Sequence, residues 1–118
     1  MALSNSYPTK EPARAEIDAL QAPTVLEFGT DWCGYCQGAQ PFIAAAFKDY
    51  PQISHIKVED GRGRPLGRSF GVKLWPTLVF LKDGKEVARL VRPQGAAEIS
   101  AAMRKIVDDG TRAAPEGR

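Results

Sequence analysis

Hydrophobic and polar positions along the chain predict strands that alternate with helices. Short runs that are mostly apolar or that alternate with period two are typical of strands, and four such runs occur: Thr24–Gly29, Ile53–Glu59, Thr77–Lys82 and Glu86–Val91. The first is apolar at almost every position, so we expect it to be buried on both faces of a sheet. Asp83-Gly84 separates the last two runs and predicts an antiparallel hairpin.

Apolar residues at helical spacing predict the helices between these strands. The longest helix runs from Cys33 to Tyr50 and contains Pro41, which removes a backbone hydrogen bond and is expected to kink it. The other predicted helices are an early one capped by Thr9 and ended by Pro23, a short one around Arg68 and Phe70 stopped by Gly71, and a last one from Ala96 to Asp108 ended by Gly110.

This order of elements predicts an α/β protein with a central mixed sheet flanked by helices on both faces. The 118 residues are enough for one domain and too few for two. We expect residues 1–8 to be a flexible N-terminus, residues 9–109 to form the domain, and residues 110–118 to be a flexible tail. No internal repeat is visible.

Composition and charge exclude several function classes. Apolar residues make up 43% of the chain and charged residues 25%, as in ordinary globular proteins, and the net charge of +2 gives no case for nucleic acid or a membrane surface. The start has no basic region followed by an apolar core, so we expect a cytoplasmic protein. The basic loop Arg62–Arg68 is interpreted as solvated, with a docking patch for an acidic partner as the alternative.

The chain's two cysteines, Cys33 and Cys36, direct attention to redox chemistry. A bond between them would close only a tiny loop, which stabilises a fold little. Zinc usually needs four ligands, and the only histidine, His55, is expected to be a solvated strand residue. The pair therefore favours redox chemistry over a metal site or inert thiols.

The position of the pair assigns a role to each thiol. Cys33 follows a strand and opens a helix, where unpaired N–H groups and the helix dipole favour a thiolate, so it is the expected nucleophile, exposed at the surface. Cys36, one turn on and shielded, is the expected resolving thiol. Gly34 leaves room for a client's disulfide, and Trp32 offers an apolar wall beside it.

These features together resemble the thioredoxin family. The matching pieces, in their order along residues 20–109, are Glu27, Trp32-Cys33-Gly34-Tyr35-Cys36, Pro41, Trp75-Pro76-Thr77 and Asp83-Gly84. The resemblance implies the thioredoxin fold and a cis peptide bond before Pro76, with the backbone of Trp75 available to pair with an extended client. It also implies that Glu27 is a buried acid beneath Cys36, near Lys57 on the adjacent strand.

The expected chemistry of Glu27 follows from its surroundings. An acid on an apolar strand loses hydration, which raises its pKa toward neutrality, while Lys57 would oppose that shift. We therefore expect Glu27 to exchange a proton with Cys36 near physiological pH.

Some positions depart from the family pattern. Tyr35 replaces a typical proline, Gln37 replaces a usual basic residue, and Arg92-Pro93 falls where the family has a small pair beside its substrate groove. The N-terminal residues lack the alternation of the family's first strand, so we expect four strands. We interpret Trp32, Gly34, Tyr35, Trp75, Pro76 and Arg92 as substrate-contacting residues.

The leading hypothesis is a thioredoxin-like protein disulfide reductase in which Cys33 attacks and Cys36 resolves. The resemblance implies no cofactor beyond the Cys33–Cys36 disulfide, client proteins as substrates, and an electron donor such as a thioredoxin reductase. We expect a monomer that binds neither nucleic acid nor membrane. The alternatives are a thioredoxin-fold binding subunit or dedicated chaperone, and a disulfide isomerase or oxidase.

Overall fold

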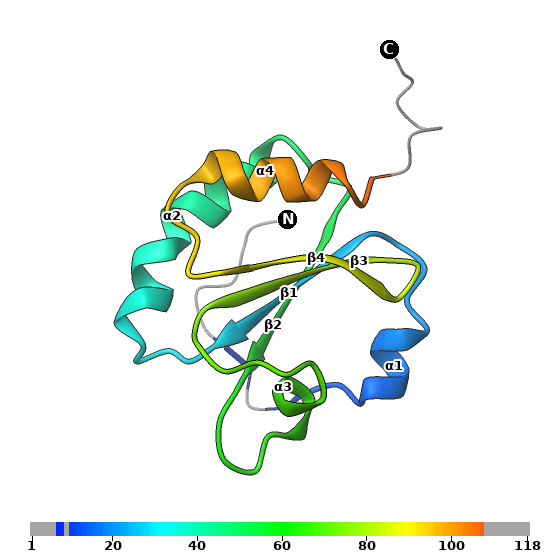
Figure 1. Cartoon of the computed structure of the whole chain (residues 1–118), viewed down its shortest axis with the longest axis vertical. Coiled ribbons are helices and arrows are strands. Elements are labelled where there is room, and N and C mark those ends of the chain that lie inside the picture. Colours follow the sequence, from blue (N-terminus) through cyan, green and yellow to red (C-terminus); the bar gives the residue numbers. More distant parts are fainter. Residues whose placement is uncertain (1–6, 9, 108–118) are drawn as a thin grey trace.

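One mixed sheet forms the centre of the protein (Figure 1). The structure is a computed structural model that describes residues 7, 8 and 10–107. In this part of the chain the sheet has four strands in the order β2-β1-β3-β4, with β1 parallel to β2 and antiparallel to β3, and β3 antiparallel to β4. Their bounds are β1 (Thr24–Gly29), β2 (Ser54–Glu59), β3 (Thr77–Lys82) and β4 (Lys85–Val91). The predicted mixed four-stranded sheet is confirmed.

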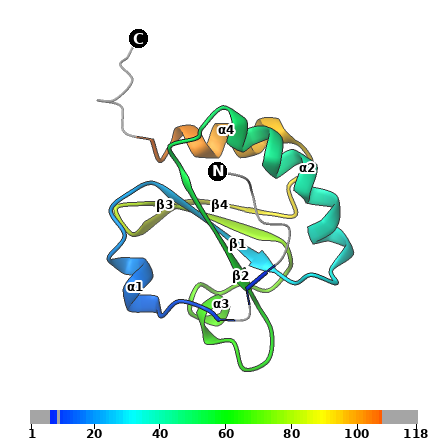
Figure 2. The same ribbon diagram turned by 180° about the vertical axis from the view of Figure 1, so that it is seen from behind.

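Helices cover both faces of the sheet, as predicted. Their bounds are α1 (Arg14–Asp18), α2 (Gly34–Lys48), α3 (Pro65–Ser69) and α4 (Ala96–Arg104). Figures 1 and 2 show α2 and α4 on one face and α1 and α3 on the other.

Side-chain alternation on the strands divides the core into two layers. Val25, Leu78 and Phe80 pack against apolar side chains of α2 and α4, including Ile43 and Met103. On the opposite face, side chains of β1 to β3 pack with those of α1 and α3, and the buried members of this layer are Ile17, Leu26, Phe28, Val58, Leu66, Phe70, Val79 and Leu81. Because β1 supplies both layers, every one of its residues is buried, as its apolar sequence predicted.

The first helix starts later than the sequence suggested. It begins at Arg14, after Ala13, which is extended and is the N-cap. Pro12 disfavours helical geometry at Glu11, which argues against a helix that starts near Thr9. The Glu16 carboxylate accepts the Ala13 N–H at 2.8 Å and so occupies one of the unpaired donors at the helix start. Thr9, the predicted cap, lies outside the described residues, as do Asp108 and Gly110 at the predicted end of the last helix.

Most of the two segments predicted to be flexible, residues 1–8 and 110–118, also lies outside the described residues. Tyr7 is described, and it is not frayed. Its side chain is 6% exposed, and its backbone N–H donates to Asp31 Oδ1 at 2.8 Å. This residue is therefore part of the packed protein.

The hairpin between β3 and β4 turns through Asp83 and Gly84, which both have positive φ, +52° and +77°. This is the conformation that favours an Asp-Gly turn between twisted strands. A Cβ on Gly84 would lie 2.1 Å from the Asp18 carbonyl oxygen at the end of α1. The turn therefore needs glycine for its backbone and for its close approach to α1.

Replacing Gly84 by alanine is expected to lower the free energy of unfolding by about 2 kcal/mol, measured by urea titration, because the left-handed conformation and the backbone clash both add cost. Gly38→Ala is the matched control, since a Cβ there meets nothing within 4 Å, and it should stabilise α2 by about 0.5–1 kcal/mol. A Gly84→Ala protein as stable as wild type would contradict the packing of α1 on this turn.

Candidate active site

The two cysteines stand at the start of α2, directly after the loop that leaves β1. Cys33 is the N-cap of the helix in an extended conformation, and its Sγ accepts the backbone N–H of Cys36 at 3.2 Å. Both cysteines are free thiols. The sulfur of Cys33 thus occupies the place at a helix start where negative charge is best stabilised.

The two thiols differ in depth. Cys33 is 8% exposed and Cys36 1%, so Cys36 is the more shielded thiol, as predicted, but Cys33 is less exposed than the sequence suggested. Burial, together with the hydrogen bond to Cys33, raises the pKa of the Cys36 thiol to about 12. Cys36 therefore keeps its proton at neutral pH in this dithiol form.

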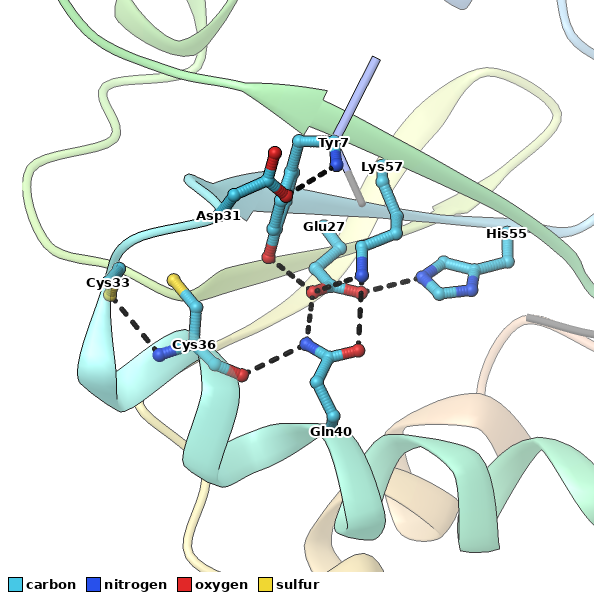
Figure 3. A network of polar contacts seen from close by, with 8 residues as sticks. All are labelled: Tyr7, Glu27, Asp31, Cys33, Cys36, Gln40, His55 and Lys57. Carbon is cyan, nitrogen blue, oxygen red and sulfur yellow. Dashed lines mark hydrogen bonds and ion pairs between the residues drawn. The ribbon is translucent and has the colours of Figure 1, made fainter. Parts of the chain in front are cut away.

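Behind Cys36 lies the fully buried carboxylate of Glu27 on β1, at the centre of a polar network (Figure 3). Its Oε2 accepts from the Tyr7 hydroxyl and, at 2.8 Å, from Gln40 Nε2, while its Oε1 lies 2.7 Å from His55 Nε2. The Lys57 Nζ is 3.7 Å from Oε2. The predicted burial of Glu27 is thus confirmed, and so is its proximity to Lys57, its register partner on β2.

This network reverses the expected direction of the Glu27 pKa. Burial alone would raise it, but the hydrogen bonds from His55 and Tyr7 and the charge of Lys57 outweigh burial and hold the pKa of Glu27 below its usual range. The expectation of a pKa near neutrality was wrong because it counted only burial and Lys57. In this resting dithiol form, Glu27 is a carboxylate throughout the physiological range.

Gln40 joins the acid to the helix that carries the cysteines. Its Nε2 also donates to the Cys36 carbonyl at 2.9 Å, and its Oε1 accepts from Lys57 Nζ at 3.1 Å. The amide therefore orients the Glu27 carboxylate and the Lys57 ammonium relative to α2.

Sequence reasoning missed three members of this network. Tyr7 was assigned to a flexible segment, and Gln40 carried no signal beyond its place one turn after Cys36 on α2. His55 was expected in solvent, but its side chain is 8% exposed and stacks on Phe47 with ring centroids 4.6 Å apart. Its position two residues before Lys57 on one face of the strand was the available signal.

Aromatic residues border the cysteine pair on its open side. Trp32 is 73% exposed, and its ring meets that of Trp75 edge-on with centroids 5.5 Å apart. The Trp75 indole N–H donates to Asp60 Oδ2 at 2.8 Å, and the peptide bond from Trp75 to Pro76 is cis, the form that the resemblance implies. Gly34 and Tyr35 are exposed beside them.

Arg92 reaches across this border. Its Nε donates to the Trp75 carbonyl at 2.8 Å, and its guanidinium lies 3.8 Å from the centroid of the Tyr35 ring. The carbonyl that we expected to be available to a client is therefore occupied. An open groove of about 910 Å³ continues from here between α2 and the loop after β4, lined by Gly34, Tyr35, Gly38, Ala39, Phe42, Arg92, Pro93 and Gln94.

The described residues contain no group of three or more His, Cys, Asp or Glu side chains placed to hold a metal ion. Within residues 7–8 and 10–107, no helix is long and apolar enough to cross a membrane.

The chain matches the family model Thioredoxin over residues 7–105. It belongs to the thioredoxin family. Thioredoxin family members are thiol:disulfide oxidoreductases. In this chain the two cysteines lie close together at the start of α2.

Individual thioredoxins are similar to the chain to different extents. Thioredoxin H-type 1 of Nicotiana tabacum is 37% identical over 67 residues, which cover 57% of this chain and 53% of the relative. Thioredoxin-1 of Saccharomyces cerevisiae is 34% identical over 92 residues, which cover 75% of this chain and 89% of the relative. The chain spans only 53% and 58% of the first two curated relatives that it matches.

The structure of reduced thioredoxin 2 from Pseudomonas aeruginosa has a TM-score of 0.78 to this protein. It is 59% identical, and the match covers 86% of this chain and 94% of that one. The resemblance therefore extends over nearly the whole thioredoxin fold.

Proposed function

We propose that the protein is a protein-disulfide reductase that uses Cys33 as nucleophile and Cys36 as resolving thiol. The observation that carries this proposal is the pairing of a thiol at the N-cap of α2 with a deeper thiol one turn on. Glu27 and Lys57 are the proposed proton-handling pair behind them.

The reaction proceeds in two exchanges. The Cys33 thiolate attacks one sulfur of a client disulfide, forming a mixed disulfide and releasing the client's other sulfur as a thiolate, which takes up a proton. Cys36 then loses its proton and attacks Cys33 Sγ, which forms the Cys33–Cys36 disulfide and releases the second client thiol. The client gains two electrons and two protons, and a separate donor must return the enzyme to the dithiol.

Reduction of insulin, with dithiothreitol as the donor, tests this function. We expect turnover well above the rate of dithiothreitol alone, because the enzyme's thiols are positioned for both exchanges. A rate no higher than that background would contradict the proposed reductase and favour the alternative of a thioredoxin-fold binding subunit or chaperone.

The redox potential of the cysteine pair separates the reductase from an isomerase or oxidase. A reductase should have a potential near the thioredoxin value of about −270 mV, whereas about −120 mV would indicate a dedicated oxidant. Tyr35, between the two cysteines, is the residue whose departure from the family pattern makes this measurement necessary.

The proposed clients are proteins with accessible disulfides, and the proposed donor is a thioredoxin reductase acting on a cytoplasmic monomer. Trp32, Gly34, Tyr35, Trp75 and Pro76 form the proposed client-contact surface. A client strand that pairs with the backbone at Trp75 competes with the Arg92 side chain for the Trp75 carbonyl.

Replacing Arg92 by glycine is therefore expected to raise kcat/KM for insulin about twofold to tenfold, the worth of one net hydrogen bond. Glycine also suits the backbone there, since Arg92 has φ of +52°. Arg68→Ala, which removes a charge at an exposed position of α3, is the control and should leave kcat/KM unchanged. An unchanged or lower kcat/KM for Arg92→Gly would show that the guanidinium does not compete with the client.

A further inference from the structure

Resolution of the mixed disulfide requires the Cys36 thiol to lose a proton at a site that is nearly inaccessible to solvent. The thiol is 1% exposed. The nearby base is the Glu27 carboxylate, whose hydrogen-bond donors among the described residues are Tyr7, Gln40 and His55, with Lys57 close by. Cys36 is not one of these donors, so the acid receives the thiol's proton through another group.

The Tyr7 hydroxyl lies where such a group is needed. It donates to Glu27 Oε2, and it also lies beside the Cys36 sulfur. A Cβ built on Gly29 would be 2.7 Å from Tyr7 Oη and 2.5 Å from Cys36 Sγ, so both atoms crowd the same point above the end of β1. The missing side chain of Gly29 provides the space in which phenol and thiol meet.

We propose that Tyr7 is a catalytic residue that relays the proton of Cys36 to Glu27 during resolution of the mixed disulfide. This inference rests on the proposed reductase function and adds to it a residue from a segment outside the cysteine motif. Tyr7 qualifies because its hydroxyl contacts both the reacting sulfur and the final acceptor.

The transfer balances without any further reactant. The Cys36 S–H proton passes to Tyr7 Oη as the Tyr7 O–H proton passes to Glu27 Oε2. The products are a Cys36 thiolate, a neutral Tyr7 and a protonated Glu27. The thiolate then attacks Cys33 Sγ and the client sulfur leaves with the electron pair of the broken S–S bond. Glu27 then gives its proton to the departing client thiolate, or keeps it until the Cys33–Cys36 disulfide is reduced again, when the same path returns the proton to Cys36.

The surroundings of Tyr7 favour a proton relay in which the Tyr7 hydroxyl stays neutral. Burial and the negative charge of Glu27 raise the pKa of Tyr7 far above its usual value, so the phenol passes protons without becoming a phenolate. Its main chain is held by Asp31, and Lys57 Nζ lies 4.5 Å from the ring centroid. Among the residues that the structure describes, the charged and titratable groups that face Tyr7 are Glu27, Asp31, Cys36 and Lys57.

The mixed disulfide also favours this transfer. In the dithiol, the hydrogen bond and the charge of Cys33 both raise the pKa of Cys36. When Cys33 is bonded to a client it is neither thiol nor thiolate, so both contributions disappear. The proton of Cys36 is thus easiest to remove at the step that needs its removal.

Tyr7→Phe tests the relay because it removes only the hydroxyl. The substrate is an aromatic disulfide that releases one coloured thiolate when Cys33 attacks and a second when Cys36 attacks. Stopped-flow absorbance therefore follows both steps in one trace. At pH 7 we expect the second step to slow about 100-fold, the low end of the usual contribution of one proton-transfer group, and the first step to be unchanged. Tyr50→Phe, just beyond the C-terminal end of α2, is the control and should alter neither step.

The pH profile distinguishes a relay from a structural role. Glu27, His55 and Lys57 stay in place in Tyr7→Phe, but Cys36 must give its proton to solvent. The rate of its second step should therefore rise steadily from about pH 6 to about pH 9 and approach that of wild type, whose profile stays nearly flat. Equal second-step rates and profiles in the two proteins, or an equal loss in both steps, would overturn the relay. Loss of the first step in wild type would instead contradict the proposed function.

A measurement on the unaltered protein gives a second test. Two protons move in the proposed step, so its rate should depend on the deuterium fraction of the solvent along a curved line. A straight line, which indicates one moving proton, would overturn the relay even if Tyr7→Phe were too unstable to study.

Discussion

Serine in place of Cys33 is expected to reduce insulin turnover to the rate of dithiothreitol alone. The serine hydroxyl stays protonated at neutral pH and cannot replace the thiolate at the N-cap of α2, so no mixed disulfide forms. The measurement compares the initial rates of wild type and Cys33→Ser at equal concentration.

Cys36→Ser should fail differently, because the first attack does not need the deeper thiol. The variant should accumulate a mixed disulfide through Cys33 that mass spectrometry detects after one client has reacted. The variant that lacks both thiols is the control and should form none. If Cys36→Ser turned over like wild type, or if Cys33→Ser captured clients equally well, the assigned roles would be reversed or wrong.

Glu27→Gln is expected to lower the free energy of unfolding at pH 7 by about 3–5 kcal/mol, the usual cost of removing one partner from a buried ion pair. The amide keeps the shape of the acid but leaves the Lys57 ammonium, which is 3% exposed, without its carboxylate. Tyr7 and Gln40 both donate to Glu27 Oε2, so the amide NH₂ group of the Glu27→Gln variant, placed there, would face two donors and could not accept their hydrogen bonds. Urea unfolding measures the loss.

The loss should depend on pH in a defined direction. Because folding lowers the pKa of Glu27, the ionised acid stabilises the protein fully above the pKa of an unfolded glutamate, about 4.3, and this stabilisation disappears as the pH falls through the lower folded value. The gap between wild type and Glu27→Gln should therefore be constant near neutrality and shrink in acid.

Glu86→Gln is the matched control for this experiment. Glu86 pairs with Arg89 at 2.6 Å, but both side chains are about one-third exposed, so its loss should cost at most about 1 kcal/mol. Equal losses in the two variants, or a gap between wild type and Glu27→Gln that widens in acid, would contradict the buried network around Glu27.

Features with a local chemical cause could be predicted from the sequence. The apolar run of β1 predicted a buried strand, and Asp83-Gly84 predicted a hairpin turn with positive φ. Both could be predicted because they depend on the residues of the segment itself. The positions of Cys33 and Cys36 followed from the end of one strand and the start of the next helix. Local signals of this kind were sufficient for the fold class and the cysteine pair.

The polar network behind Cys36 could not be predicted in the same way. Its members come from segments that only the folded chain brings together: Tyr7 lies 20 residues from Glu27 and His55 lies 28. Periodicity gives the face of a strand on which His55 lies but not how deeply another helix buries that face. The direction of the Glu27 pKa depends on these distant donors, so it could not be inferred from the strand alone.

The contact between Trp32 and Trp75 allows the intrinsic fluorescence of the protein to report on its cysteine pair. These are the only two tryptophans in the chain, and both lie beside the cysteine pair. Indole emission depends on the surroundings of the ring and is quenched by a neighbouring disulfide. The intrinsic fluorescence of the protein therefore originates next to its thiols, so oxidation and the docking of a tryptophan-free client can be followed in real time without any label.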